Sequence, residues 1–251
     1  MMILHENERL DEVNDKLRLI QRTTGLTFGT DALLLAGYME GRLGRGMELG
    51  SGTGIISMLA LTRGKLSSVT AVELQPVYAE LTERNAALNG LSDKLSVLCT
   101  DVRELKGDGT YDTVFTNPPY MRTDSGRAND SGEKNIARHE VAGDISDFVR
   151  AAKGVLRFGG YFYAVYRPDR LTDLIAAMRA EAIEPKRMTF VHSDTEHEPS
   201  VVLLEGRAGG KGGMRITPPL IIYRSAAERI YTADMDYIME NGRFPEKYRG
   251  K

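Results

Sequence analysis

The sequence lacks several features that would indicate whole classes of protein. It has one cysteine in 251 residues, Cys99, so no intramolecular disulfide can form. No apolar stretch approaches the 18 or more residues that a membrane span needs. Residues 1–13 begin with a short apolar run and then become acidic, which is not the pattern of a signal peptide. These absences predict a cytoplasmic protein that has no membrane partner and is held together without disulfides.

Net positive charge and metal-ligand clusters are absent as well. The formal net charge is -2, from 33 Lys and Arg against 35 Asp and Glu, so the overall charge gives no sign of a nucleic-acid partner. A local basic surface could still bind RNA. The histidines at positions 5, 139, 192 and 197 form no ligand pattern with the single cysteine, and we therefore expect no metal.

What the chain does contain is a regular alternation of short apolar runs and helical patterns. Strands are expected at residues 47–49, 69–73, 95–99, 112–116 and 161–166, with an antiparallel pair at 187–191 and 200–205. Helices are expected at residues 55–63, 78–89, 145–156, 169–181 and 233–240. This alternation predicts an α/β fold with a mostly parallel sheet that helices cover on both faces. Because Cys99 lies in an apolar run, we expect it to be buried.

The whole chain, 1–251, is expected to form one domain. Its parts are an N-terminal segment over 1–45, a core over 46–206, and a basic loop with a C-terminal appendage over 207–251. In the first part, Thr30 or Asp31 is expected to cap a helix that begins at Ala32.

A glycine-rich turn follows the first core strand. Residues 48–54 read Glu-Leu-Gly-Ser-Gly-Thr-Gly, with a helix directly after them. Glycine permits the positive φ of a tight turn and a close approach of the backbone to a ligand. The first strand-to-helix turn is where doubly wound sheets bind cofactors. The GxGxG spacing differs from the GxGxxG that is typical of dinucleotide sites.

Two acids follow at the ends of the next two strands. Glu73 could accept both hydrogen bonds from a ribose diol, and Asp101 could contact an adenine ring. Each has a plainer interpretation, since Glu73 could be a solvated strand end and Asp101 a helix cap. Together with the glycine turn, however, they form a specific cofactor pattern.

This series resembles the class I, Rossmann-like methyltransferases over roughly residues 25–205. The resemblance implies a central, mostly parallel seven-stranded sheet with an antiparallel closing strand, and S-adenosylmethionine as cofactor. It implies glycines around the methionine part, Glu48 near the amino group, and the segment 28–31 closing over the methionine end. The cofactor-binding residues expected on this basis are Thr30, Glu48, Gly50, Ser51, Gly52, Gly54, Glu73, Leu74, Asp101, Val102 and Asn117.

The fourth strand ends in Asn117-Pro118-Pro119-Tyr120. An exocyclic amino group is a poor nucleophile because its lone pair is delocalised, so its two N–H groups must be held for in-line attack. The Asn117 side-chain oxygen and a backbone carbonyl could each accept one of these bonds, and Pro118 fixes the turn. Tyr120 offers a flat face for stacking. The motif resembles that of the amino-methyltransferases, which implies catalytic roles for Asn117, Pro118 and Tyr120.

Several acceptors remain open for such an enzyme. The amino-methyltransferases act on adenine N6, cytosine N4, guanine N2 or glutamine amides. Glutamine enzymes of the release-factor type usually carry a helical domain ahead of the catalytic one, and only 49 residues precede Gly50 here. DNA adenine enzymes generally carry a separate recognition domain, and no such insertion is visible. A catalytically silent partner subunit is a further alternative, although it would not need Asn117 and Tyr120.

Over nearly its whole length the chain resembles the bacterial tRNA adenine-N6 methyltransferases that act near the anticodon of a valine tRNA. The supporting segments are residues 28–32, 117–120, 137–140 and 219–223. The resemblance implies an RNA partner and a base displaced from the anticodon loop. In the basic stretch 206–224, Lys211 and Arg215 are the expected phosphate contacts, although solvated charges on a flexible loop explain them as well. Arg138 and His139 could close over the base or a phosphate.

Overall fold

The apolar runs of the sequence form the strands of one central sheet. A computed structural model describes residues 4–24, 28–118 and 143–249. In this part of the chain the sheet consists of β3 (Arg45–Leu49), β4 (Ser68–Glu73), β5 (Leu95–Cys99), β6 (Tyr111–Thr116), β7 (Leu156–Tyr166), β8 (Ile183–His192) and β9 (Pro199–Ala208), with the two-residue strands β10 (Arg215–Ile216) and β11 (Leu220–Ile221) on β8.

The order of the long strands across the sheet is β8-β9-β7-β6-β3-β4-β5. β9 is antiparallel to both β7 and β8, and the other pairings among these described strands are parallel. The predicted Rossmann-like sheet with its antiparallel closing strand is therefore confirmed. β10 and β11 add to it by pairing with β8 in the parallel direction.

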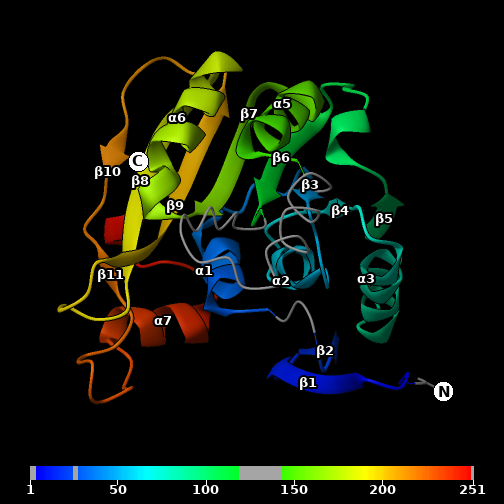
Figure 1. Cartoon of the computed structure of the whole chain (residues 1–251), viewed down its shortest axis with the longest axis horizontal. Helices are drawn as coiled ribbons and strands as arrows, with labels where there is room; N and C mark the ends of the chain where they lie inside the picture. The colour runs from blue at the N-terminus through cyan, green and yellow to red at the C-terminus, as the bar shows by residue number, and fades with distance from the viewer. Residues whose placement is uncertain (1–3, 25–27, 119–142, 250–251) are drawn as a thin grey trace, which may run out of the picture.

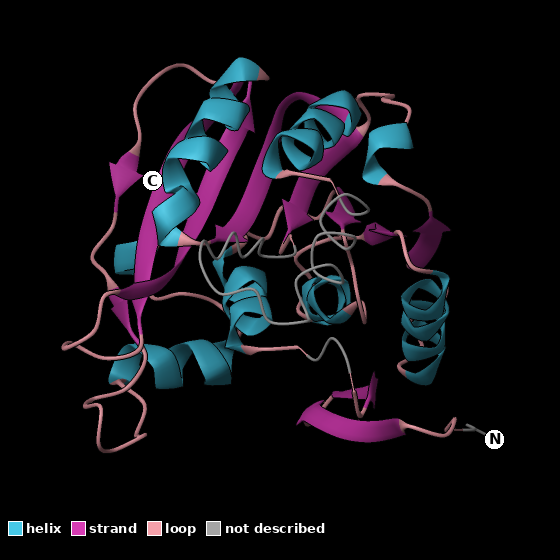
Figure 2. Ribbon diagram, in the orientation of Figure 1, coloured by secondary structure: helices cyan, strands magenta, loops and turns pink. Residues whose placement is uncertain are grey.

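Helices cover both faces of this sheet, as Figures 1 and 2 show. They are α1 (Thr30–Tyr38), α2 (Ile55–Thr62), α3 (Pro76–Leu88), α5 (Ile145–Val155), α6 (Leu171–Ala180) and α7 (Ala233–Asn241), with the short helices η1 (Val102–Glu104), η2 (Pro168–Arg170) and η3 (Glu246–Tyr248). Adjacent residues of a strand point to opposite faces of the sheet and so pack in different cores. Phe115 packs on the side of α1, α2 and α7, whereas Val114 packs on the side of α5 and α6.

An N-terminal hairpin, β1 (Glu8–Asn14) and β2 (Leu17–Arg22), is a feature that the sequence analysis missed. It docks on α3, whose Asn85 and Asn89 bond to the backbone of β2. Asn85 accepts from Ile20 N at 2.7 Å and donates to Ile20 O at 3.0 Å. Asn89 does the same with Arg18, at 3.0 and 2.7 Å. Arg84 adds two bonds to the Glu8 carboxylate, at 2.6 and 2.7 Å, which lower the pKa of Glu8.

Two local predictions are wrong. Neither Thr30 nor Asp31 caps α1, because the N-cap is Gly29 in extended conformation, with no side-chain capping bond, and Thr30 is already helical. Cys99 is exposed, because β5 is the last strand at its side of the sheet and has β4 as its one described neighbour. Within the described ranges, no helix is long and apolar enough to cross a membrane.

Candidate active site

The parallel strands bring distant residues to one edge of the sheet. β3, β4, β5, β6 and β7 end there at Leu49, Glu73, Cys99, Thr116 and Tyr166, and we call this the carboxyl edge; the other ends of the same strands form the amino edge. The chain proceeds outward from β3 to β4 and β5 on one side, whereas β6 and β7 lie on the other. Ligands of open α/β sheets bind at such a switch point.

The glycine turn between β3 and α2 uses three left-handed backbone conformations. Gly50, Gly52 and Gly54 have φ values of 73°, 55° and 77°. A Cβ at Gly54 would lie 2.6 Å from Thr82 Cγ2, whereas one at Gly52 would meet nothing within 4 Å. Gly54 is therefore required by close packing on α3, and the open side of the turn lies at Gly52.

Two polar residues on the buried side of α3 hold this turn in place. Thr82 Oγ1 donates to Gly52 O at 2.9 Å, and Asn85 Nδ2 donates to Thr53 O at 3.1 Å. Both side chains are fully buried. Neither residue was predicted from the sequence, although a threonine and an asparagine on the buried side of a helix could have indicated a polar partner there.

Glu73, the predicted ribose ligand, is buried at 6% exposure at the end of β4. One carboxylate oxygen accepts from Gly52 N at 2.9 Å, and the other accepts from Gln75 N at 2.9 Å. The second core strand and the glycine turn are thereby joined through this side chain. Each carboxylate oxygen retains a further lone pair with which to accept a bond from a hydroxyl group.

Glu48 lies directly before the turn and is 1% exposed. Its carboxylate accepts hydrogen bonds from the backbone N–H and the hydroxyl of Ser57 on α2. Burial raises the pKa of Glu48 to about 8, and the nearby charge of Glu73 acts in the same direction. Two buried carboxylates thus face the same turn, and no ion pair to either is found among the described residues.

This environment fits S-adenosylmethionine, which carries a sulfonium and an ammonium group. A cation bound beside Glu48 and Glu73 would offset the cost of burying their charges. Ser51 Oγ is buried without a hydrogen-bond partner among the described residues, and Gly52 leaves open space where a side chain would stand. The orphaned hydroxyl, the open glycine and Glu48 are the groups that would hold the methionine part, and Glu73 stays the predicted ribose ligand.

The other predicted cofactor residues lie around this centre. Asp101 caps η1 by accepting from Arg103 N at 2.8 Å, and it forms an ion pair with the Arg103 guanidinium that lowers the pKa of Asp101. Val102 is buried, and Leu74 is half-buried directly after Glu73. Thr30 is half-buried at the start of α1. Contact of these four with the cofactor stays a prediction.

Asn117 and Pro118 follow β6 at the same edge. Thr116 Oγ1, fully buried, donates to Leu49 O at 2.8 Å and so fixes the end of β6 against the end of β3. Asn117 Oδ1 is buried and has no hydrogen-bond partner in the described ranges. An unused acceptor beside the cofactor turn is what an incoming N–H group would need. Pro119, Tyr120, Arg138 and His139 lie outside the described residues.

A cavity of about 300 Å³ lies at the carboxyl end of β7. Because β7 pairs with β6 at Ala164 and Thr116, the ends of the two strands are neighbours. Residues that line the cavity include Asp144, Ser146, Tyr166, Arg167, Arg170 and Asp173. Arg167 and Arg170 are held by ion pairs to Asp169 and Asp173. The sequence analysis named neither arginine, since nothing local distinguishes them from other surface charges.

The two predicted RNA contacts in the basic stretch lie at the opposite edge. Gly209 N donates to Ala182 O at 2.8 Å, which keeps the loop beside the start of β8. Lys211 is exposed there, and its carbonyl accepts from Lys186 Nζ at 3.0 Å. Arg215 donates to the carbonyls of Lys247 and Arg249. RNA contact at these positions stays a prediction, and it would be separate from the carboxyl edge.

No group of three or more potential metal ligands occurs in the part of the chain that the structure describes. The absence of a metal from the enzyme stays a prediction.

Comparisons with known proteins identify the family of the chain. Residues 23–171 match the family described as "Methyltransferase small domain". A tRNA1(Val) (adenine(37)-N6)-methyltransferase of Porphyromonas gingivalis is 28% identical over 198 residues, which cover 74% of this chain and 76% of that protein.

Solved structures share the fold. A predicted O-methyltransferase of Agrobacterium tumefaciens matches with a TM-score of 0.70 and 23% identity, over 86% of this chain and 98% of that one. A geranyl diphosphate C-methyltransferase of Streptomyces coelicolor, solved with S-adenosyl-L-homocysteine among its ligands, matches with a TM-score of 0.53 and 13% identity, over 71% and 75% of the two chains. The chain therefore belongs to the methyltransferase small domain family and is an S-adenosylmethionine-dependent methyltransferase.

Proposed function

We propose that the enzyme methylates the exocyclic N6 of an adenine in tRNA. The single observation that carries the proposal is the buried Asn117 Oδ1 at the end of β6, beside the cofactor turn, which has no hydrogen-bond partner among the described residues. This acceptor suits a planar nitrogen that carries two N–H groups. Hydroxyl acceptors would instead require a base to remove their proton, and no such base follows from the motif.

The residues of the chain would act mainly by positioning. Asn117 Oδ1 accepts one N–H bond of the amino group, and the backbone carbonyl of Pro118 accepts the other. The lone pair is thereby turned out of conjugation toward the methyl group that S-adenosylmethionine supplies when it is bound. The product nitrogen then loses its proton to water. Holding two reactants in this geometry can contribute about 7–11 kcal/mol to the barrier reduction.

The choice of tRNA adenine is supported by the names of relatives. Proteins from Porphyromonas gingivalis and other bacteria that share 24–28% identity with this chain are tRNA1(Val) (adenine(37)-N6)-methyltransferases. The cavity at the end of β7 adds polar groups beside the proposed base site. Arg167 and Arg170 lie there, and we infer that they contact RNA phosphates close to the target base. Tyr120, Arg138 and His139 stay proposed contacts to the base or its phosphates, and a cytoplasmic location stays expected.

The test is a methyl-transfer assay with labelled S-adenosylmethionine. Total tRNA and a protein extract are offered separately, with ribosomal RNA as a third acceptor. The products are digested and identified by mass spectrometry. Label in N6-methyladenosine of tRNA is the expected result. Label in glutamine side chains or at guanine N2 would show that the methyl acceptor is a different group, and the proposed role of Asn117 would remain. Saturable transfer by the isolated chain would exclude a silent partner subunit.

A further inference from the structure

A second cavity lies at the far ends of the two helices that begin at the active site. α1 and α2 start at the carboxyl edge, with Thr30 and Ile55, and they end at the amino edge beside Gly41 and Lys65. Nine helical residues correspond to about 13 Å along the axis. The cavity there, about 230 Å³, is therefore remote from the glycine turn and Asn117.

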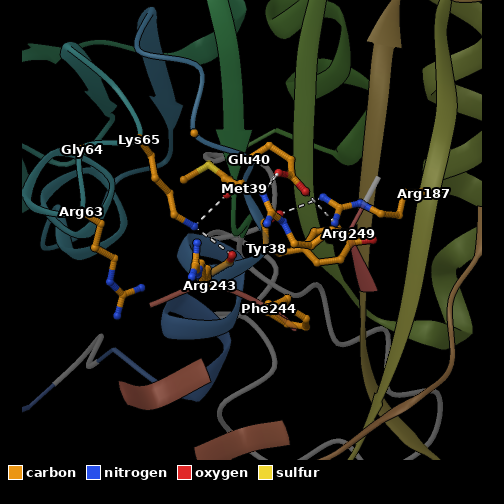
Figure 3. Close-up of a pocket in the computed structure, with 12 residues that line it drawn as sticks. Tyr38, Met39, Glu40, Arg63, Gly64, Lys65, Arg187, Arg243, Phe244 and Arg249 are labelled. Atoms are coloured by element: carbon orange, nitrogen blue, oxygen red, sulfur yellow. Dashed lines mark hydrogen bonds and ion pairs between the residues drawn. The ribbon is translucent and has the colours of Figure 1, made fainter. Parts of the chain in front are cut away.

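Cationic side chains dominate the lining of this cavity, as Figure 3 shows. Five come from separate parts of the chain, and Glu40 is the acid among the lining residues. The five are Arg63, Lys65, Arg187, Arg243 and Arg249. We call these five residues the cationic pocket.

Two of the five already have acidic partners. Arg187, 2% exposed, pairs with Glu205 at 2.6 Å and also donates to the carbonyls of Tyr38 and Tyr248. Arg249 pairs with Glu40 at 3.2 Å. The bond from Arg187 to Tyr38 O fastens β8 to the end of α1, and the pair with Glu40 fastens the C-terminal segment there. The two acidic partners leave little negative charge for the rest of the pocket.

The other three have no acid within ion-pair distance among the described residues. Lys65 Nζ donates to three carbonyls at the end of α1, those of Ala36, Gly37 and Met39, at 2.6, 2.9 and 2.7 Å. Arg63 makes one long bond of 3.4 Å to Gly242 O. Arg243 is exposed at the rim, and its side chain has no hydrogen bond or ion pair within the described part of the chain. The pKa of Lys65 is lowered to about 7, mainly by burial and secondly by the nearby charge of Arg63.

An anion bound in a cavity reduces the repulsion between the positive charges around it. A phosphoryl group matches them best, because guanidinium forks bind phosphate oxygens in pairs, and free phosphate also carries more charge than a carboxylate. The volume of about 230 Å³ is ample for one such group.

We propose that the cationic pocket binds a phosphoryl group, presented either by free phosphate or by the backbone of the RNA substrate. The RNA source rests on the proposed function. It is supported by the position of Arg215, which donates to the carbonyl of Arg249, so the basic stretch adjoins the pocket. Phosphate binding at the amino edge would hold the RNA at a point distant from the base that is methylated.

The test compares wild type with the double variant Arg63→Gln/Arg243→Gln in the full chain. Arg9→Gln/Arg18→Gln is the matched control, since it removes the same charge from the exposed hairpin. Binding of inorganic phosphate is followed by ³¹P NMR or calorimetry. Binding of tRNA is followed between about 50 and 200 mM salt, where phosphate contacts have a large effect. The affinity for S-adenosylmethionine reports whether each variant is folded. Arg243→Gln alone, at an exposed position, is the second variant in case the double variant does not fold.

We expect the double variant to bind inorganic phosphate at least tenfold more weakly, with the control unchanged. If tRNA affinity and its salt slope fall as well, the source is RNA; if tRNA binding is unchanged, the source is free phosphate. If wild type binds phosphate but no tRNA, the proposed function is refuted, and the proposal that the pocket binds a phosphoryl group remains valid. Wild-type protein that binds no phosphate, or variants that bind both ligands like wild type, would overturn the proposal.

Discussion

Next to the glycine turn the carboxyl edge buries two carboxyl groups, whereas the pocket at the amino edge gathers cations, although the same helices connect the two places. At the carboxyl edge, Glu48 and Glu73 are buried beside the glycine turn. At the amino edge, three of the five cations in the pocket have no acidic partner in the described ranges. The comparison teaches that packing alone does not explain why like charges gather at each place. A cationic cofactor beside the two carboxyl groups, and an anion in the cationic pocket, would each neutralise the group of charges that it meets.

The largest expected effect is a loss of catalytic rate at the carboxyl edge that leaves cofactor binding almost unchanged. Asn117→Ala should lower kcat on the order of 10²–10³-fold, the size seen when one positioning hydrogen bond is lost from an active site. Because the side chain is proposed to hold the acceptor, the affinity for S-adenosylmethionine should change less than about twofold. Single-turnover assays and calorimetry measure the two quantities. Asn241→Ala, exposed on α7, is the control, and equal loss of cofactor binding in Asn117→Ala would contradict the proposed division of roles.

At the amino edge, Lys65→Met should destabilise the fold and leave cofactor affinity intact. The variant deprives three carbonyls at the end of α1 of their donor, which should cost about 3 kcal/mol in the free energy of unfolding. Urea denaturation measures this. An unchanged midpoint would mean that water satisfies those carbonyls equally well, and Arg243→Gln should lie within about 0.5 kcal/mol of wild type.

Glu73→Gln should weaken S-adenosylmethionine binding about ten- to a hundredfold. The amide keeps the size of the side chain but loses the negative charge and one acceptor, while Gly52 N still needs a partner. Equilibrium binding by calorimetry measures the effect. Glu83→Gln, exposed on α3, is the matched control, and the interpretation of Glu73 fails if both variants bind the cofactor equally well.

The smallest expected effect is the pH dependence that Glu48 contributes at the carboxyl edge. The pKa of Glu48 is raised from 4.5 to about 8, so the folded chain binds a proton between these values that the unfolded chain has released. The free energy of unfolding contributed by this group is therefore full below pH 4.5 and is lost as the pH rises through 8. The slope should be at most about 1.4 kcal/mol per pH unit.

Glu48→Gln should remove that slope. Urea denaturation of wild type and variant at several pH values between 5 and 8.5 measures it, and saturating S-adenosylmethionine should flatten the wild-type curve by favouring the carboxylate. Parallel pH curves for the two proteins would show that Glu48 titrates normally.

Much of the fold could be predicted from the sequence, because buried parallel strands read as short continuous apolar runs. The glycine turn and its acids could be predicted for a related reason: strand ends converge wherever the strands are parallel. Supporting contacts such as Thr116 with Leu49 O, or Thr82 with Gly52 O, could not, since they depend on register between elements far apart in sequence.

The hairpin and the cationic pocket escaped prediction for different reasons. β2 alternates over its first three residues, with Leu17 and Leu19 buried and Arg18 exposed, but Ile20 and Gln21 are both buried, and the polar composition of the segment masked the signal. The residues of the cationic pocket are spread from position 63 to position 249, and no local spacing connects them. Cys99 was predicted to be buried because an apolar run does not reveal whether a strand is central or at the edge.

Asn85 and Asn89 have a consequence for the solution behaviour of the protein. A two-stranded hairpin leaves outward N–H and C=O groups, and such groups can pair with a strand of another molecule. On β2 these groups, at Arg18 and Ile20, are already bonded to two side-chain amides spaced one helical turn apart. A helix thus imitates the missing third strand. Loss of either amide would reopen this edge, and the first sign would be self-association of the enzyme rather than loss of methyl transfer.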